Sequence, residues 1–181
     1  MSMDYFLEPS EKQALQKWHV WLDDNRGDRA RLRRADNPED ILLTNAFFNF
    51  LDRLPEKWRD ENRILTSACI AGAISHIKDE PTKTLTFAQQ LATPAEGKSR
   101  APMSELRFQQ LQKSPTIDDF YRSIIRSVRL LDRKVNIASL ANDIVQWHQE
   151  FNKPLGRSKP NNRLAVRWAT DYYTALPKNT D

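Results

Sequence analysis

The sequence has few of the residues on which disulfides and metal centres depend. It contains one cysteine, Cys69, and three histidines in 181 residues. A single cysteine forms no disulfide within the chain, as is usual for proteins of a reducing cytosol. With a mean hydropathy of −0.71, the chain has no apolar run of about 18 residues, and no basic-then-apolar leader opens it. We therefore expect a cytoplasmic protein that does not span a membrane.

Glycine is also scarce, and strand patterns are rare. Four glycines and ten prolines favour helices that are separated by prolines. We predict an all-α fold made of two small helical bundles. Three prolines and a charged loop lie between residues 78 and 103, which we interpret as the region that links the two lobes. The N-terminal bundle is predicted over residues 1–85 and the C-terminal bundle over residues 86–181.

Helix boundaries are indicated by side chains that cap free backbone N–H groups. Ser10 with Gln13, Asn37 before Pro38, Thr116 with Asp119, and Asn136 are the main capping signals. They predict helices over about 10–23, 37–54, 117–134 and 137–151, the last with Phe151 on its inner face. Residues 64–77 are small or apolar nearly all round, which indicates a buried central helix that includes Cys69 and Ala73.

Signals for catalysis are weak. The three histidines lie far apart, and none has a metal-protease or zinc-finger spacing. Cys69 and His76 are seven residues apart on one helix face, and we assign both to packing. Paired carboxylates fall at predicted helix ends, where the helix dipole favours negative charge in a first turn. No glycine-rich phosphate loop is present. We therefore predict no catalytic residue, no metal and no cofactor.

Charge is unevenly distributed along the chain. The net charge is +4, but residues 26–34, 98–134 and 153–167 carry +4, +5 and +5 respectively. The remaining residues must therefore sum to −10. Such segregation suggests one surface for a polyanion and another for a different partner. The alternative is that these blocks scatter over the folded surface.

The predicted helix after Thr116 carries a stripe of arginines. Successive helical residues turn by about 100°, so four arginines fall within an arc of about 60°, in a stripe about 16 Å long. The four are Arg122, Arg126, Arg129 and Arg133. No acid interrupts residues 120–131 to pair with them, and a polyanion would neutralise their mutual repulsion. An ordinary solvated or protein-binding face is the alternative.

A second basic cluster lies near the N-terminus, where Arg26, Arg29 and Arg33 share one helix face. Arg31 and Arg34 lie nearby, and the planar fork of arginine binds phosphate with two hydrogen bonds. A tail cluster is less diagnostic because linkers are often basic; it comprises Arg157, Lys159, Arg163 and Arg167. Base-reading chemistry is not evident in any cluster, so we expect contacts with the nucleic-acid backbone that are indifferent to sequence.

The order of these motifs resembles a known family. Trp18 and Trp21, then Gly27 to Ala30, then Leu32-Arg33-Arg34-Ala35, are similar to the N-terminal signature of the CasB family. The segments Arg107 to Leu111, Ile117 to Leu131 and Ile137 to Trp147 are similar to its C-terminal lobe. CasB is the small subunit of the type I-E CRISPR Cascade complex. The resemblance covers about residues 10–150, without the loop 93–102 or the tail after 151.

The resemblance implies two helical bundles and no catalytic activity. It further implies two copies in the complex, beside the backbone and large subunits. There the subunits hold the crRNA–target assembly and help to stabilise the displaced DNA strand in antiviral defence. Arg33, Arg34 and Arg107 are the matching site positions, and the stripe from Arg122 to Arg133 overlaps a basic region of the family.

Two other interpretations remain open from the residues themselves. The helix that carries Arg122 and the helix over 137–151 could mimic a helix-turn-helix DNA-binding regulator. The second of these helices, however, lacks base-reading side chains on an exposed N-terminal face. Alternatively, the chain could be a protein-only scaffold whose basic blocks meet acidic partners.

Overall fold

The computed structural model describes residues 7–153 and 159–178, and over these residues the fold is all-α, as predicted. Ten α-helices and two short 3-10 helices are present in the described ranges, with no strand beyond one isolated bridge between Asp79 and Lys134. The α-helices are α1 (Pro9–Asp24), α2 (Arg26–Arg33), α3 (Pro38–Ile41), α4 (Asn45–Asp52), α5 (Ile64–Ser75), α6 (Phe87–Ala92), α7 (Glu105–Gln112), α8 (Ile117–Leu130), α9 (Ile137–Asn152) and α10 (Leu164–Ala175).

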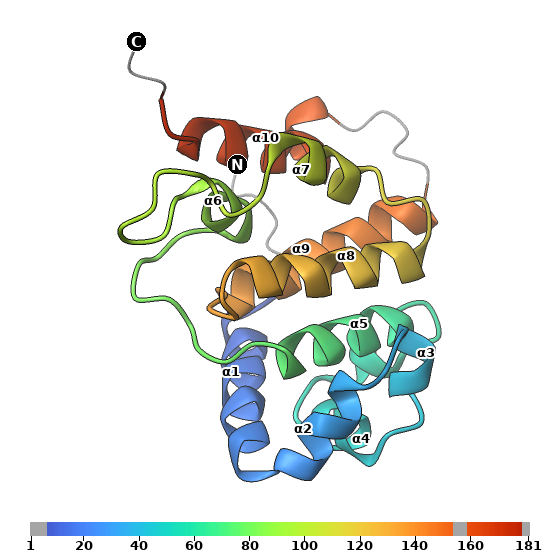
Figure 1. Ribbon diagram of the computed structural model, residues 1–181. Helices are drawn as coiled ribbons and strands as arrows, with labels where there is room; N and C mark the ends of the chain where they lie inside the picture. Colours follow the sequence, from blue (N-terminus) through green and yellow to red (C-terminus); the bar gives the residue numbers. More distant parts are fainter. Residues whose placement is uncertain (1–6, 154–158, 179–181) are drawn as a thin grey trace.

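The helices are arranged around a central pair. α8 and α9 cross the middle of the molecule, with α1 to α5 on one side and α6, α7 and α10 on the other (Figure 1). α5 packs against both α8 and α9, while α10 packs against α6 and α9. No helix of the described ranges is long and apolar enough to cross a membrane.

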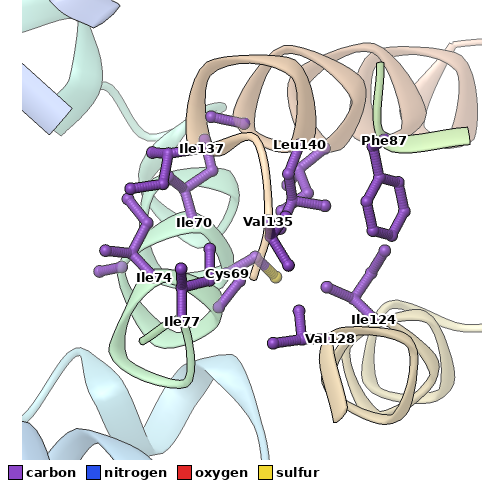
Figure 2. Packing of buried hydrophobic residues seen from close by; sticks show 14 of the residues in the cluster. Cys69, Ile70, Ile74, Ile77, Phe87, Ile124, Val128, Val135, Ile137 and Leu140 are labelled. Carbon is purple, nitrogen blue, oxygen red and sulfur yellow. The ribbon is translucent and has the colours of Figure 1, made fainter. Parts of the chain in front are cut away.

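The apolar helix predicted over residues 64–77 is α5, and its residues 66–75 are all buried. Cys69 and Ala73 are each 1% exposed, which confirms the prediction. In Figure 2 the Cys69 side chain of α5 points toward Val128 of α8, whereas Ile70 and Ile74 lie on the other side of α5, in the region of Ile137 of α9. A helix that is apolar on all faces is stable only where other elements cover it completely.

Gly72 allows a close approach at the centre of α5. A Cβ atom at this position would overlap the Ile41 side chain of α3 and the Tyr121 ring of α8, whose Cε2 would be 2.9 Å away. Glycine has no side chain, so α8 can lie directly on the α5 backbone here. This contact fixes the position of the helix that carries the arginine stripe.

Most capping predictions are confirmed. Asn37, Thr116 and Asn136 accept hydrogen bonds from the backbone N–H groups of Asp40, Asp119 and Ser139. The Ser10 prediction is wrong, because α1 begins at Pro9 after Glu8, and no side chain caps it. Proline at the first helical position has no N–H group that requires a cap.

Two other helix boundaries and the orientation of one side chain differ from prediction. Residues 37–54 form two helices, because the Thr44 side chain caps a new helix that begins at Asn45. The helix predicted over 117–134 ends at Leu130. Phe151, predicted to face inward, is 47% exposed and stacks on the Trp147 ring with centroids 4.9 Å apart.

The two-bundle division stays a prediction. Buried side chains from α1 to α10 form one continuous hydrophobic cluster. The backbone from Ile77 to Thr86 connects α5 to α6, and α6 packs on α10. The helices before and after residues 78–103 therefore share a core through α5, α8 and α9.

Candidate nucleic-acid interface

α8 presents the arginine stripe on its exposed side. Arg122, Arg126 and Arg129 are exposed, whereas Phe120, Ile124 and Val128 on the opposite side are buried. Arg122 makes a 3.5 Å ion pair with Asp119, in which both side chains are about half exposed. Such exposed pairs contribute at most about 1 kcal/mol, so Arg122 remains available to another anion. The three helical arginines span roughly 10 Å along the axis.

Arg133 belongs to this surface, but it does not lie on the helix. The N–H groups of Asp132 and Arg133 donate to the carbonyls of Arg129 and Val128, at 3.1 and 3.0 Å. This pattern is a Schellman motif, which requires a left-handed residue after the helix. Asp132 and Arg133 accordingly have φ of 53° and 62°. Our prediction that Arg133 continues the helical stripe is therefore wrong, because the chain turns before it.

The turn at Arg133 lies beside the end of α5. Its carbonyl accepts hydrogen bonds from the N–H groups of Lys78 and Asp79, at 2.8 and 3.3 Å, and the Val135 N–H donates to the Asp79 carbonyl at 3.0 Å. These bonds connect residues that are more than fifty positions apart. They place the last arginine of the stripe next to the C-terminal end of the central helix.

α2 reaches the same place from the other side. The Arg29 guanidinium donates to the carbonyls of Ser75, at 3.1 Å, and Ile77, and it forms a 2.7 Å ion pair with Asp23. Its side chain is only 17% exposed. Arg29 thus satisfies carbonyls at the end of α5 and attaches α2 there, which makes it the least available of the predicted arginines.

The two predicted basic clusters meet around His76. Burial, followed by the charges of Arg33, Arg129, Arg133 and Arg29, lowers the pKa of His76 to about 4. Burial and the same neighbours, Arg133 foremost, lower the pKa of Arg33 as well. The imidazole is 4% exposed, and its Nδ1 atom has no hydrogen-bond partner within residues 7–153 and 159–178. Like charges are therefore gathered around a neutral histidine.

Arg107 joins the stripe through a groove between α7 and α8. The groove has a volume of about 380 Å³ and contains Arg107, Arg126 and Arg129 in its lining. The remaining lining residues are Met103, Gln110, Leu111, Ser123, Ser127 and Leu130. These six residues were not predicted from the sequence. Ser123 and Ser127, one turn apart beside the stripe, are a signal for it, because small side chains leave space on a helix face.

We call the side chains of this region the arginine surface: Arg33, Arg107, Arg122, Arg126, Arg129 and Arg133. Within the described residues, only Arg122 and Arg126 of this set have a polar side-chain partner, respectively Asp119 and the Ser123 hydroxyl at 3.3 Å. Arg26 and Arg34 are exposed at the two ends of α2. Their membership in the same site stays a prediction.

The tail cluster does not join the arginine surface as a unit. Arg167 forms a 2.7 Å ion pair with buried Asp143, which also accepts a hydrogen bond from the Trp168 indole at 2.8 Å. Arg167 therefore attaches α10 to α9. Arg163 lies at the start of α10, Lys159 is exposed, and Arg157 lies outside the described residues.

Cys69 and His148 contact each other in the buried core. The Cys69 sulfur lies 3.4 Å from Nε2 of His148 on α9. Burial raises the pKa of the Cys69 thiol well above its ordinary value and lowers the pKa of His148 to about 4, so the pair is neutral. Only a thiolate is an effective nucleophile. Among the described residues, no three side chains of His, Cys, Asp or Glu are grouped as metal ligands.

The helix-turn-helix interpretation does not fit the geometry. α9 would be the recognition helix, but its residues 140–148 are all buried. A recognition helix must expose one face along its N-terminal half in order to enter a major groove. α9 instead lies against α1, α5 and α10.

The fold and this surface together define an all-helical protein that gathers arginines from α2, α7 and α8. The family model of the CRISPR-associated protein Cse2 matches residues 28–173. The chain therefore belongs to the Cse2 family, the CasB small subunits of the type I-E CRISPR Cascade complex. No curated protein and no solved structure matches the chain significantly.

Proposed function

We propose that this chain is a non-catalytic, sequence-independent nucleic-acid-binding small subunit of a Cascade surveillance complex. The arginine surface holds the sugar–phosphate backbone of the crRNA–target assembly and of the displaced DNA strand during antiviral defence. The chain works in the cytoplasm beside the backbone and large subunits and a second copy of itself. Family membership supports its place in the complex, and the arginine surface supports its role there.

The convergence of partner-free arginines is the observation that carries this proposal. Arg33, Arg129 and Arg133 come from two helices and a turn, and their side chains have no hydrogen-bond or ion-pair partner among the described residues. Their mutual repulsion destabilises the free protein. A polyanion removes this repulsion, and a guanidinium binds phosphate oxygens with two parallel hydrogen bonds.

Backbone contact without base specificity follows from the chemistry of these side chains. Phosphates are the same in every sequence, so contacts with them give affinity and register but no sequence information. α8 has 14 residues and exposes Arg122, Arg126 and Arg129 along one face. This row of arginines is suited to contacts with successive phosphates of a nucleic-acid strand. It is not suited to entering the major groove of a duplex to read base edges.

Fluorescence anisotropy tests the proposal with two unrelated single-stranded oligonucleotides. Replacing Arg122, Arg126 and Arg129 with Ala should weaken binding of both strands to a similar degree, because backbone contacts carry no base information. Binding should be measured with the isolated chain and with the complex reconstituted from its other subunits. The same measurement with duplexes of two unrelated sequences tests the alternatives: strong preference for one duplex would favour a regulator, and absence of binding in both settings at low salt would favour a protein-only scaffold.

A further inference from the structure

The groove between α7 and α8 differs from the rest of the arginine surface because it has an apolar floor. Met103 and Leu111 are 3% and 1% exposed, and they line the groove together with half-buried Leu130. The exposed Arg107, Arg126 and Arg129 form its rim. Phosphate binding alone requires no apolar hollow, since a phosphate gains nothing from contact with Leu or Met.

We infer that this groove receives one nucleobase of a single-stranded nucleic acid, while its rim arginines hold the adjoining phosphates. The inference rests on the proposed function and extends it from the backbone to the base. A ligand that fits must combine a flat, largely apolar part with neighbouring negative charge. A nucleotide has both, and the planes of arginine side chains stack on unstacked bases.

The size of the groove limits what it can hold. Its volume of about 380 Å³ lies at the small end of ligand pockets, which range over about 300–1,000 Å³. A single nucleobase fits within this volume. Gln110 and Ser123 lie among its polar lining residues, and both side chains can donate or accept hydrogen bonds. They can satisfy different base edges, so the groove tolerates any base.

The groove is held open by contacts outside it. The Met103 N–H donates to the Leu91 carbonyl at 3.1 Å, and the Met103 carbonyl accepts from the Tyr172 hydroxyl at 2.6 Å. Phe108 of α7 stacks on the Tyr172 ring with centroids 4.0 Å apart. α7 is thereby fixed on α10, so its distance from α8 does not depend on a ligand. A preformed site loses little conformational entropy on binding.

Only unpaired nucleotides can use such a groove, because a base within a duplex is stacked and paired. DNA and RNA single strands share the required chemistry.

Binding should be measured by anisotropy with single strands in which every base is present, and with matched strands in which alternate bases are abasic. Both are prepared as DNA and as RNA, and are assayed with the isolated chain and the reconstituted complex.

Wild-type protein should bind the intact strand about 5–10-fold more tightly than the abasic one, near the lower end of stacking contributions. Ser123→Leu fills the groove without changing charge and should bring this ratio close to one. The salt dependence of strand binding by Ser123→Leu should equal that of the wild type, because the arginines remain. Ser10→Leu, on the exposed side of α1, is the matched control and should retain the full ratio.

Equal affinity of wild-type protein for intact and abasic strands, with binding retained, would overturn the nucleobase site and leave backbone binding intact. This comparison needs no variant, so it holds even if Ser123→Leu fails to fold. Loss of the ratio in Ser10→Leu as well as in Ser123→Leu would also overturn it. No binding to any strand would instead refute the proposed function. A base effect confined to DNA or to RNA would support the site and identify the strand that occupies it.

Discussion

Two buried histidines should make this protein sensitive to mild acid. His76 and His148 are 4% and 2% exposed. Burial lowers the pKa of each to about 4, with arginine charges adding to the effect at His76. In the unfolded chain both imidazoles titrate near pH 6.5. Between pH 6.5 and 4, the unfolded state therefore binds more protons than the folded state, and the free energy of unfolding falls as pH falls.

The size of this effect follows from the pKa difference. One pKa unit corresponds to about 1.4 kcal/mol, so each histidine removes roughly 3 kcal/mol of stability by pH 4. The two together approach the whole stability of a typical domain, about 5–15 kcal/mol. Above pH 6.5 both groups are neutral in both states, and their contribution is constant.

Urea unfolding at pH 7.0 and pH 4.5, followed by circular dichroism, measures the loss directly. The double variant His76→Gln, His148→Gln should lose several kcal/mol less than the wild type between these pH values. Asp143 and Glu150, whose pKa values are raised by burial, titrate with the opposite sign. Asp143 and Glu150 are present in both proteins. The difference between the stability losses of the wild type and the double variant therefore reports the two histidines alone. Equal losses in the two proteins would refute the reasoning.

Three further predictions concern the core. Cys69 should resist alkylation at pH 8 until denaturant unfolds the chain, because burial raises its thiol pKa; rapid native labelling would contradict this. Gly72→Ala should lower the melting temperature by a few degrees, since overpacking costs about 1–3 kcal/mol and helix propensity returns at most about 1. Adding Tyr121→Phe should restore part of that loss, and no recovery would argue against the Tyr121 overlap. Ala73→Trp should destabilise by roughly 1–3 kcal/mol or more, and unchanged melting would contradict its burial.

Local features of the fold were predictable because they depend on neighbours in sequence. Thr116 and Asn136 cap helices that follow them within three residues. The apolar character of residues 64–77 required burial wherever the helix lay. The end of α8 was not predictable in this way. Asp132 occupies a left-handed position that glycine usually fills, and backbone bonds to Lys78 and Asp79 hold the turn that follows.

The site was partly predictable for the same reason. Helical spacing placed Arg122, Arg126 and Arg129 on one face, since that depends on the helix alone. The internal role of Arg29 depends on carbonyls of Ser75 and Ile77, which are 46 and 48 positions away. Sequence periodicity contains no information about that contact. The groove likewise depends on how α10 holds α7, which only the packed structure defines.

Salt dependence of binding tests the central claim most directly. Each phosphate contact on a single strand contributes about −0.7 to the slope of log affinity against log salt, so replacing Arg122, Arg126 and Arg129 with Ala should flatten the slope by roughly 2.

A matched control removes three positive charges elsewhere: Lys17, Lys83 and Lys178 are exposed and lie outside the arginine surface. Replacing these lysines with Ala should keep the wild-type slope, because contact and not net charge releases counterions. If the arginine variant keeps the wild-type slope and affinity, or if the lysine variant flattens the slope equally, the arginine surface does not bind the backbone.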